Sequence, residues 1–542
     1  MLNVVEPRYA FDTTHISTAE VVNAIDNLSN KKSFGDDEFS IALIRYIKNQ
    51  IALPIAHIAN LMIRTGSYPD RLKLAKIFLI FKGNEKQILG NYRLISLLSW
   101  FNKIFEYIIN ARLNIFLARN DLLCANQFGF RKNSNTIVPL SELSNHMQTA
   151  IDDKKLGCCV FLDIAKAFDV VKHDILILKL ECMGIPNSIT KLLTCYLTNR
   201  SQYILHDGLK SNICKTNTGV PQGSILGPTL FNIYVNDLPN FIQNSEVAMF
   251  ADDVACFNTN HDINTLYQTM QQDLKAIEHW YASNHLAINI NKSNFIIFKS
   301  RANINKVNDI VKINNLTLSI YNNTLAYVSS TKYLGLIFDE VLNWNSHVDK
   351  IAKTINIQIG ALYKIKKLVP RKVLLSFYYA NIHSHIIYAL PIWGANYNKC
   401  LHPIIIAQKK AVRIIGNVGY IAHTRDLFTQ FAILNVEKLW AQSTACHVYK
   451  IFNNIYPHNI SINLTENIST NSEWIISTRT RNAKTLVLPS PNSNYGKFAM
   501  SFCGPWVWNQ LPEKIRKACS INTFKISSKK YYLECSMRSL IG

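Results

Sequence analysis

Three aspartates in this chain lie where proteins rarely place charge. Asp163 ends an apolar run that begins at Cys158, and the pair Asp252 and Asp253 separates two further apolar runs. Short apolar runs predict buried strands, and two runs joined by a tight polar step predict a hairpin. A buried carboxylate is costly unless something pairs with it, and carboxylate oxygens are the ligands that Mg²⁺ and Mn²⁺ prefer. Two such ions can clamp the attacking and leaving oxygens of a phosphoryl transfer.

Other acidic pairs in the chain have a different setting. Asp36 and Asp37 lie in a polar stretch, and two lysines follow the pair at 152–153. Both are most simply solvated charges or residues at helix ends. For Asp252 and Asp253 considered alone, an exposed turn is the competing interpretation.

A segment rich in glycine and proline, residues 218–228, lies between Asp163 and the acidic pair. Glycine lets a backbone approach a substrate closely, and Pro228 suits the first turn of a helix. The apolar residues from Leu230 to Leu238 follow helical spacing. An ordinary loop followed by a core helix is the alternative for this segment in isolation.

Together these segments resemble the palm of a reverse transcriptase. The segments that carry the resemblance are Phe161–Asp169, Gly219–Ser224 and Phe250–Asp253. Their order and spacing are similar to those of polymerases from non-long-terminal-repeat (non-LTR) retrotransposons, the long interspersed elements, with a jockey-like or related style. Further segments resemble other blocks of the family: 66–69, 91–98, 127–131, 286–292, 333–335, 390–394 and 504–512.

The resemblance implies an α+β fold of the right-hand polymerase type, with fingers, an antiparallel palm sheet, a helical thumb and a C-terminal extension. We expect an N-terminal extension at residues 1–50 and the fingers with the palm at residues 51–338. We expect a helical thumb at residues 339–457, and a linker with a C-terminal module at residues 458–542. Apolar residues from Val348 to Ile359 follow one helix face, which supports a helical thumb. Basic residues from Lys364 to Lys372 would grip a primer–template duplex.

The resemblance also implies an RNA-directed DNA polymerase, which extends a DNA primer on an RNA template with deoxynucleoside triphosphates. Asp163 and Asp252 would bridge two Mg²⁺ or Mn²⁺ ions, and Asp253 would ligate more weakly or support them. The backbone carbonyl of Ile164 would complete one metal site. The ring of Phe168 would block the 2′ position and so favour deoxynucleotides, with core packing as its alternative role.

Five more residues complete the expected site. Lys82 and Arg93 would neutralise the triphosphate, and Gln222 and Gly223 would touch the nascent base pair and the template. Lys292 would protonate the leaving pyrophosphate. Judged from the sequence alone, each of the three cationic residues is about equally well explained as a surface charge.

Two other functions stay open. One is a catalytically inactive or co-opted nucleic-acid-binding remnant of such an element, and the other is an RNA-templated RNA polymerase. The intact set of site residues favours activity, and the aromatic Phe168 argues against ribonucleotide use. Relatives commonly carry an endonuclease domain before the polymerase. About 50 residues precede the fingers here, which is too few for one, so we expect this chain to lack it.

Composition agrees with a nucleic-acid partner. The 542 residues carry a net charge of +22, and Lys and Arg neutralise phosphates and release counterions. The 12 cysteines form no Cys-x-x-Cys pair, so a zinc knuckle is not expected, and the reduced thiols suit an intracellular site in the nucleus or cytoplasm. The N-terminus does not resemble a signal peptide, and polar residues interrupt the apolar stretch 373–395, so no membrane association is expected.

Overall fold

The computed structural model describes residues 6–30, 33–83, 85–314, 316–456 and 485–535, and the chain folds into two compact units. The first unit is built from Met1–Phe130, Asp163–Gln243 and Lys275–Asn289. The second unit is built from Arg131–Leu162, Asn244–Leu274 and Ile290–Gly542. The segments of the two units alternate along the sequence, so each unit depends on contacts between distant parts of the chain.

The first unit combines helices with a sheet. Its helices are α1 (Thr18–Asn27), α2 (Ile41–Tyr46), α3 (Lys48–Thr65), α4 (Trp100–Arg119), α6 (His173–Cys182), α7 (Asn187–Leu197) and α8 (Gly227–Tyr234), with short 3-10 turns at Asp70–Lys73, Leu89–Asn91 and Leu238–Phe241. Side chains and glycine set several helix ends: Ser17 accepts the Glu20 N–H at the start of α1, and Gly66 ends α3 with a left-handed φ of 68°.

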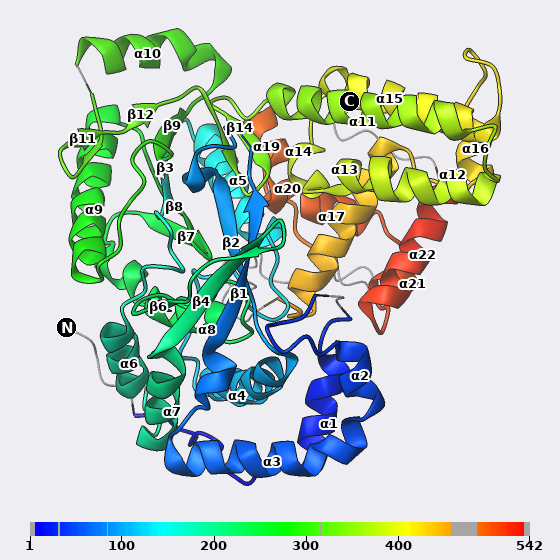
Figure 1. Ribbon diagram of the computed structural model, residues 1–542. Coiled ribbons are helices and arrows are strands. Elements are labelled where there is room, and N and C mark those ends of the chain that lie inside the picture. The colour runs from blue at the N-terminus through cyan, green and yellow to red at the C-terminus, as the bar shows by residue number, and fades with distance from the viewer. Residues whose placement is uncertain (1–5, 31–32, 84, 315, 457–484, 536–542) are drawn as a thin grey trace. The chain divides into compact units, whose positions relative to one another are not determined.

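The sheet of the first unit is built around β1. Its strands are β1 (Leu74–Phe81), β2 (Tyr92–Leu97), β4 (Arg200–His206), β5 (Leu209–Lys210) and β6 (Cys214–Thr216). β1 pairs antiparallel with β2 and parallel with β4, and β4 pairs antiparallel with β5 and β6. The long ribbons of β1, β2 and β4 lie side by side in Figure 1. Two segments about 120 residues apart thus form one surface.

The second unit contains the expected palm sheet, whose strand order is β12-β9-β3-β8-β7. Its strands are β3 (Leu156–Asp163), β7 (Glu246–Phe250), β8 (Asp253–Asn260), β9 (Asn294–Phe298) and β12 (Ala326–Tyr327). The pairs β3–β9 and β7–β8 are antiparallel, and β12–β9 is parallel. Cys158, Cys159 and Val160 are fully buried, so the apolar run before Asp163 is a core strand, as predicted.

Two small hairpins accompany this sheet. They are β10 (Ser319–Ile320) with β11 (Asn323–Thr324), and β13 (Ser330–Tyr333) with β14 (Leu336–Asp339). Helix α5 (Ile137–Asp152) packs on β7 and β8, where the rings of His146 and Phe257 meet edge to face. Helix α9 (Ile263–Ser283) runs from the segment of the second unit into that of the first.

The rest of the second unit is mainly helical, which agrees with the helices predicted within residues 339–457, and the assignment of a thumb stays a prediction. Its helices are α10 (Ile304–Ile313), α11 (Asn345–Ile365), α12 (Arg371–Tyr378), α13 (Ser384–Ile387), α14 (Leu390–Trp393), α15 (Asn398–Gly416), α16 (Arg425–Gln430), α17 (Val436–Phe452), α19 (Asn494–Phe498), α20 (Met500–Asn509), α21 (Glu513–Arg516) and α22 (Ile521–Glu534), with a 3-10 turn at Arg301–Asn303 and a π-helical turn at Tyr379–His383. Helices α11 and α15 run side by side (Figure 1). The prediction of a mixed α and β fold is confirmed.

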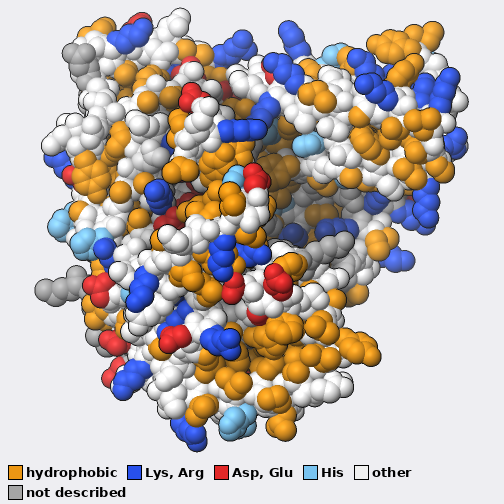
Figure 2. All heavy atoms as spheres, in the orientation of Figure 1, with side chains coloured by type: hydrophobic (Ala, Val, Ile, Leu, Met, Phe, Trp, Pro, Cys, Tyr) orange, Lys and Arg blue, Asp and Glu red, His pale blue; other side chains and the backbone are white. Residues whose placement is uncertain are grey.

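Basic residues are exposed on this helical part. Figure 2 shows Lys and Arg side chains gathered over α11, α12 and α15. The cluster noted in the sequence runs from the end of α11 to the start of α12, and Lys364, Lys367, Arg371 and Lys372 in it are exposed. In the second unit this helical surface therefore carries exposed positive charge that suits phosphates.

All 12 cysteines are free thiols. Among the helices that the structure describes, none has both the length and the apolar character needed to cross a lipid bilayer.

Candidate active site

Asp252 and Asp253 lie at the tip of the β7–β8 hairpin in the second unit. Phe250 pairs with Asp253 in the antiparallel register, so Ala251 and Asp252 form the turn. Ala251 has a φ of 57°, a left-handed conformation that is uncommon for a residue other than glycine. Both aspartates are half-buried. The prediction that an acidic hairpin stands between two apolar strands is confirmed.

A second hairpin, β13–β14, packs on this acidic hairpin. The Tyr333 hydroxyl donates a hydrogen bond to the carbonyl of Ala248 in β7, at 3.3 Å, and the Tyr333 ring lies 5.0 Å from that of Phe161 in β3. Burial raises the pKa of Tyr333 well above its ordinary value, and the negative charge of Asp253 adds to that rise. The block 333–335 noted in the sequence is therefore placed beside the acidic turn.

Asp163 is the last residue of β3 and begins a segment of the first unit. The backbone beyond β3 stays paired: Asn289 donates to the Asp163 carbonyl at 2.8 Å, Ala165 donates to the Ala287 carbonyl at 2.8 Å, and Ile164 bridges to Ile288. The half-buried side chain of Asp163 thus extends from the end of a strand whose backbone is held by hydrogen bonds. Lys292 belongs to the second unit and is exposed in the turn before β9.

The donor chemistry of the three aspartates suits a hard divalent cation. All three are half-buried carboxylates, Asp163 and Asp253 at strand ends and Asp252 in the hairpin turn, and β3 and β8 are neighbours in the sheet. No group of three His, Cys, Asp or Glu side chains close enough to hold a metal ion occurs within the described residues. The shared metal site of the three aspartates stays a prediction.

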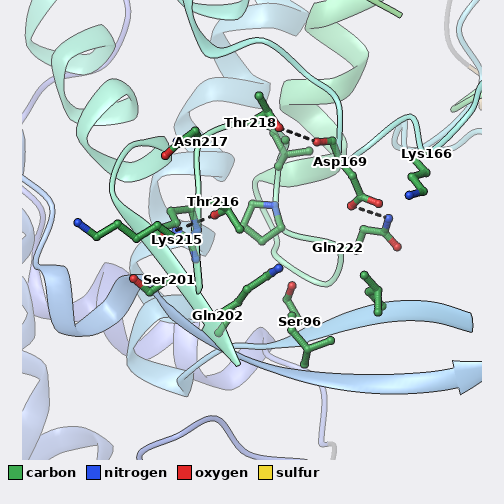
Figure 3. A pocket seen from close by; sticks show the side chains of 17 residues that line it. Ser96, Lys166, Asp169, Ser201, Gln202, Lys215, Thr216, Asn217, Thr218 and Gln222 are labelled. Atoms are coloured by element: carbon green, nitrogen blue, oxygen red, sulfur yellow. Dashed lines mark hydrogen bonds between the residues drawn. The ribbon is translucent and has the colours of Figure 1, made fainter. Parts of the chain in front are cut away.

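A cavity of about 380 Å³ opens in the first unit, between the sheet and the glycine-rich segment (Figure 3). β1, β2, β4 and β6 contribute to its wall, together with Lys166, Asp169 and the run Asn217–Gln222. The charged residues that line it are Lys166, Asp169, Arg200 and Lys215. Three cations against one carboxylate give the cavity a net positive charge, which favours an anionic ligand such as a nucleotide.

Gln222 is held at the edge of this cavity by both its backbone and its side chain. Its carbonyl accepts a hydrogen bond from the Ser96 N–H at 2.7 Å, which ties the glycine-rich segment to β2. Its side-chain Nε2 donates to Oδ1 of Asp169 at 3.0 Å (Figure 3). The predicted substrate residue therefore lines a cavity, and the carboxylate that pairs with it was not among the predicted site residues.

Two glycines make this close packing possible. Gly219 has a φ of 85°, and a Cβ there would lie 2.7 Å from the carbonyl oxygen of Asp169. Gly223 has a φ of 120°, and a Cβ there would lie 2.7 Å from the carbonyl oxygen of Ser96. Any side chain at either position would both strain the backbone and push the neighbouring chain away.

The remaining predicted residues of the first unit surround this segment. Phe168 follows the turn after Asp163, and its carbonyl accepts the Val220 N–H at 2.7 Å. Lys82 closes the β1–β2 hairpin, because its N–H donates a hydrogen bond to the Asn91 carbonyl. The positive charge of Lys82 acts to lower the pKa of Asp169. Arg93 is exposed on β2 opposite Ile80. The structure thus places Gln222 against Asp169 and Phe168 next to it in the chain, while Gly223 adjoins Gln222 and the charge of Lys82 acts on the pKa of Asp169.

Asp169 is the clearest functional candidate that sequence reasoning missed. Burial raises its pKa, although the hydrogen bond from Gln222 and the positive charges of Lys166 and Lys82 act to lower it. Asp169 belongs to the segment Phe161–Asp169 that resembles the palm, but its partner Gln222 lies 53 residues away in sequence. No local pattern therefore connects the two residues.

Glu106 was missed as well. It is fully buried in α4 and accepts the N–H of Ile225, two residues after Gly223, at 2.6 Å. The available indication was a lone acid within the largely apolar run from Ile104 to Ile109.

Comparisons with known proteins agree with these observations. RNA-directed DNA polymerases from Drosophila melanogaster are similar to this chain: that of the mobile element jockey is 29% identical over 428 residues, covering 76% of this chain and 45% of that protein. The probable polymerase of transposon BS is 28% identical, with coverages of 79% and 48%. The probable polymerase of transposon X-element is 28% identical, with coverages of 78% and 46%. The chain spans about half the length of the curated relatives it matches.

A solved structure of apo telomerase from Candida tropicalis, truncated from its C-terminal domain, matches with a TM-score of 0.35 and 11% identity, covering 56% of this chain and 65% of that one. The model of the family described as reverse transcriptase (RNA-dependent DNA polymerase) matches residues 80–338. This match contains Asp163, Gln222, Asp252 and Asp253. Residues 80–338 therefore match the reverse transcriptase family, and most of the chain is similar to RNA-directed DNA polymerases of mobile elements and transposons.

Proposed function

We propose that this protein is an RNA-directed DNA polymerase that extends a DNA primer on an RNA template with deoxynucleoside triphosphates. The observation that carries the proposal is the cationic cavity beside Gln222, whose charged lining residues all lie in the segment that matches the family. Gly219 and Gly223 let the main chain pass at close range there, and Lys82 and Phe168 lie on the same unit. An anionic substrate with a flat base and a sugar fits a cavity of this charge and composition.

We further propose that Asp163, Asp252 and Asp253, with the carbonyl of Ile164, hold two Mg²⁺ or Mn²⁺ ions. Such ions, when bound, offset the negative charge that gathers in the transition state of nucleotidyl transfer. Catalysis of this kind is mostly positioning and electrostatics. The half-buried carboxylates at the ends of ordered strands supply fixed oxygen donors, which supports the assignment.

The other side chains act on the substrates. Lys82 and Arg93 would bind the triphosphate, Arg93 through two parallel hydrogen bonds and Lys82 as a point charge. Gln222 and Gly223 would contact the nascent base pair and the template. Lys292, exposed before β9, would give a proton to the leaving pyrophosphate. The basic surface of α11, α12 and α15 would bind the phosphates of the primer–template duplex.

Primer extension with carboxylate variants tests the proposal. Asp163→Asn and Asp252→Asn keep the size of each side chain and remove its charge. We expect each to lower the rate of primer extension on an RNA template at least about 100-fold. RNA affinity should stay unchanged, because distributed basic residues provide it. Asp309→Asn, at an exposed position of α10, is the matched control.

Two outcomes would overturn this assignment. Near-wild-type extension by Asp163→Asn or Asp252→Asn would remove that carboxylate from the metal site. A wild-type protein that binds RNA but extends no primer with either ion would instead be a nucleic-acid-binding remnant of such an element.

A further inference from the structure

We infer that Asp169 is a positioning residue that orients the Gln222 side-chain amide, so that Gln222 turns its carbonyl oxygen toward the substrate. The inference deepens the proposed polymerase function and rests on it for the identity of the substrate. Figure 3 shows the amide nitrogen of Gln222 facing the Asp169 carboxylate and the amide oxygen facing away from it.

The chemistry of the pair fixes this orientation. An amide has a donor side and an acceptor side, whereas an ionised carboxylate only accepts. Only the NH₂ group of Gln222 can therefore face Oδ1 of Asp169 at the 3.0 Å separation. The Gln222 amide oxygen is thus left as an acceptor for a donor on the substrate, and a reversed amide would place two acceptors against each other.

The backbone segments that carry Asp169 and Gln222 are already joined by hydrogen bonds. Only the side chain of Gln222 then has to be ordered. Gly219 donates its N–H to the carbonyl of Val171 at 2.8 Å, and Val220 donates to Phe168 at 2.7 Å. The Thr218 hydroxyl donates to the Asp169 carbonyl at 3.1 Å (Figure 3). On the far side, Gln222 accepts from Ser96. A long amide side chain on a fixed backbone keeps its rotamer freedom until a partner holds it.

Asp169 is suited to that task. It is half-buried and accepts a hydrogen bond from the Gln222 side chain, with the positive charges of Lys166 and Lys82 nearby. Burial raises the pKa of Asp169, whereas the hydrogen bond from Gln222 and these cations favour the ionised form, which is the form that can only accept. An ordered Gln222 would not have to lose side-chain freedom when substrate binds, so the pair pre-organises the cavity.

The test is a double-mutant cycle in the full chain. Asp169→Leu removes the acceptor with little change of shape, and Gln222→Met removes the amide. We expect each to lower kcat/KM for the deoxynucleotide by about tenfold to hundredfold, the effect of losing a hydrogen bond to a charged group. The double variant should be no worse than the more impaired single variant. Asp169→Asn, which retains an acceptor oxygen, should stay within about threefold of wild type.

Several outcomes separate the possibilities. Additive losses, or an Asp169→Leu loss that persists in the Gln222→Met background, would show that Asp169 acts through another group and would overturn the inference. Wild-type kcat/KM in Asp169→Leu would do the same. Asp207→Asn, at a side chain 88% exposed beside β5, controls for the loss of one negative charge.

Two further measurements keep the test decisive. Thermal unfolding of each variant identifies a loss that comes from misfolding, and Asp169→Asn then carries the comparison. Equilibrium binding of a fluorescent deoxynucleotide to the same variants reports the coupling even when the wild type extends no primer. Polymerase failure with intact coupling would thus refute the proposed function alone, whereas uncoupled binding would refute the role of Asp169.

Discussion

The ring of Phe168 stacks on the ring of Phe231, with centroids 4.7 Å apart and planes 20° from parallel. Phe231 is fully buried in α8, and Phe130 meets the Phe168 ring edge to face at 6.1 Å. The proposed sugar-selecting ring is therefore supported from behind by the core. A ring held in this way resists displacement by a 2′ hydroxyl, because moving it would break an aromatic stack.

Shortening Phe168 is expected to relax sugar selection. In Phe168→Val and Phe168→Ala, space opens where the ring stood, and the ratio of kcat/KM for deoxy- over ribonucleotide should fall at least about tenfold. Phe231→Leu, which removes only the supporting ring, should lower the ratio less. An unchanged ratio in folded Phe168 variants would exclude Phe168 as the sugar gate.

The local elements of this fold could be predicted from the sequence. Apolar runs beside Asp163 and around Asp252 are strands, and the acidic pair is at a hairpin tip. Pro228 stands in the first turn of α8, as expected. These features follow from periodicity and from the conformational limits of single residues, which act over a few positions.

The contacts between distant segments could not be predicted in this way. The pairing of Asp169 with Gln222 depends on two main chains approaching at Gly219, a fact of tertiary packing. The parallel pairing of β1 with β4 joins segments about 120 residues apart and has no local pattern. The joint geometry of Asp163 with the acidic hairpin stays a prediction.

Glu106 is expected to be needed as a carboxylate: burial raises its pKa, and hydrogen bonds from its three donors act to lower it. Its Oε1 accepts from the Tyr196 hydroxyl at 2.7 Å and from the Asn102 amide at 2.6 Å, and its Oε2 accepts from the Ile225 N–H. The Tyr68 hydroxyl bonds Oδ1 of Asn102 and so fixes the direction of that amide. A glutamine side chain has one acceptor oxygen and one NH₂ donor, whereas hydrogen-bond donors face both oxygens of Glu106.

Glu106→Gln should therefore lower the free energy of unfolding by about 2 kcal/mol or more, since it leaves a buried donor against a donor. Tyr196→Phe removes one donor and should cost only about 1 kcal/mol. Denaturation by urea measures both. Equal stability of Glu106→Gln and wild type would mean that the three donors accept a glutamine in place of the carboxylate. That result would contradict this prediction.

Glu142 on α5 predicts a dependence of stability on pH. Burial raises its pKa from 4.5 to about 8, with a contribution from the charge of Glu246, and its Oε1 has no hydrogen-bond partner among the described residues. Between these two pKa values the folded protein keeps a proton that the unfolded chain releases. The free energy of unfolding should therefore fall as pH rises from about 4.5 to about 8, by at most about 1.4 kcal/mol per pH unit from this group.

Glu142→Gln isolates this effect from the titration of His146, which lies 3.5 Å from Glu246. Compared with wild type, Glu142→Gln should raise the midpoint temperature of unfolding at pH 8. At pH 5 this temperature should be nearly unchanged, because Glu142 and the glutamine that replaces it are both neutral in the folded protein. Thermal unfolding at the two pH values decides the matter. A shift of the same size at both would assign the change to packing.

Tyr388 is expected to hold the β13–β14 hairpin in place beside the acidic turn. Its hydroxyl donates to the carbonyl of Leu334, in the turn of that hairpin, and lies 3.1 Å from the hydroxyl of Thr136 at the start of α5. Gly335 has a φ of 88°, and a Cβ there would lie 3.2 Å from the Tyr388 ring. The hairpin in turn contacts β7 through the Tyr333 hydroxyl, as described above.

Tyr388→Phe keeps the ring and removes only the hydrogen bonds, so it should lower the free energy of unfolding by about 1 kcal/mol. Gly335→Ala adds both a left-handed strain and a close contact, and it should cost about 1–3 kcal/mol. Because the hairpin adjoins Asp253, both variants should slow primer extension while RNA affinity stays constant. Urea denaturation and single-turnover extension measure the two effects. Loss of stability without slower extension would show that the Tyr388 contact serves only the fold of the second unit, since a displaced β13–β14 hairpin would disturb the acidic turn.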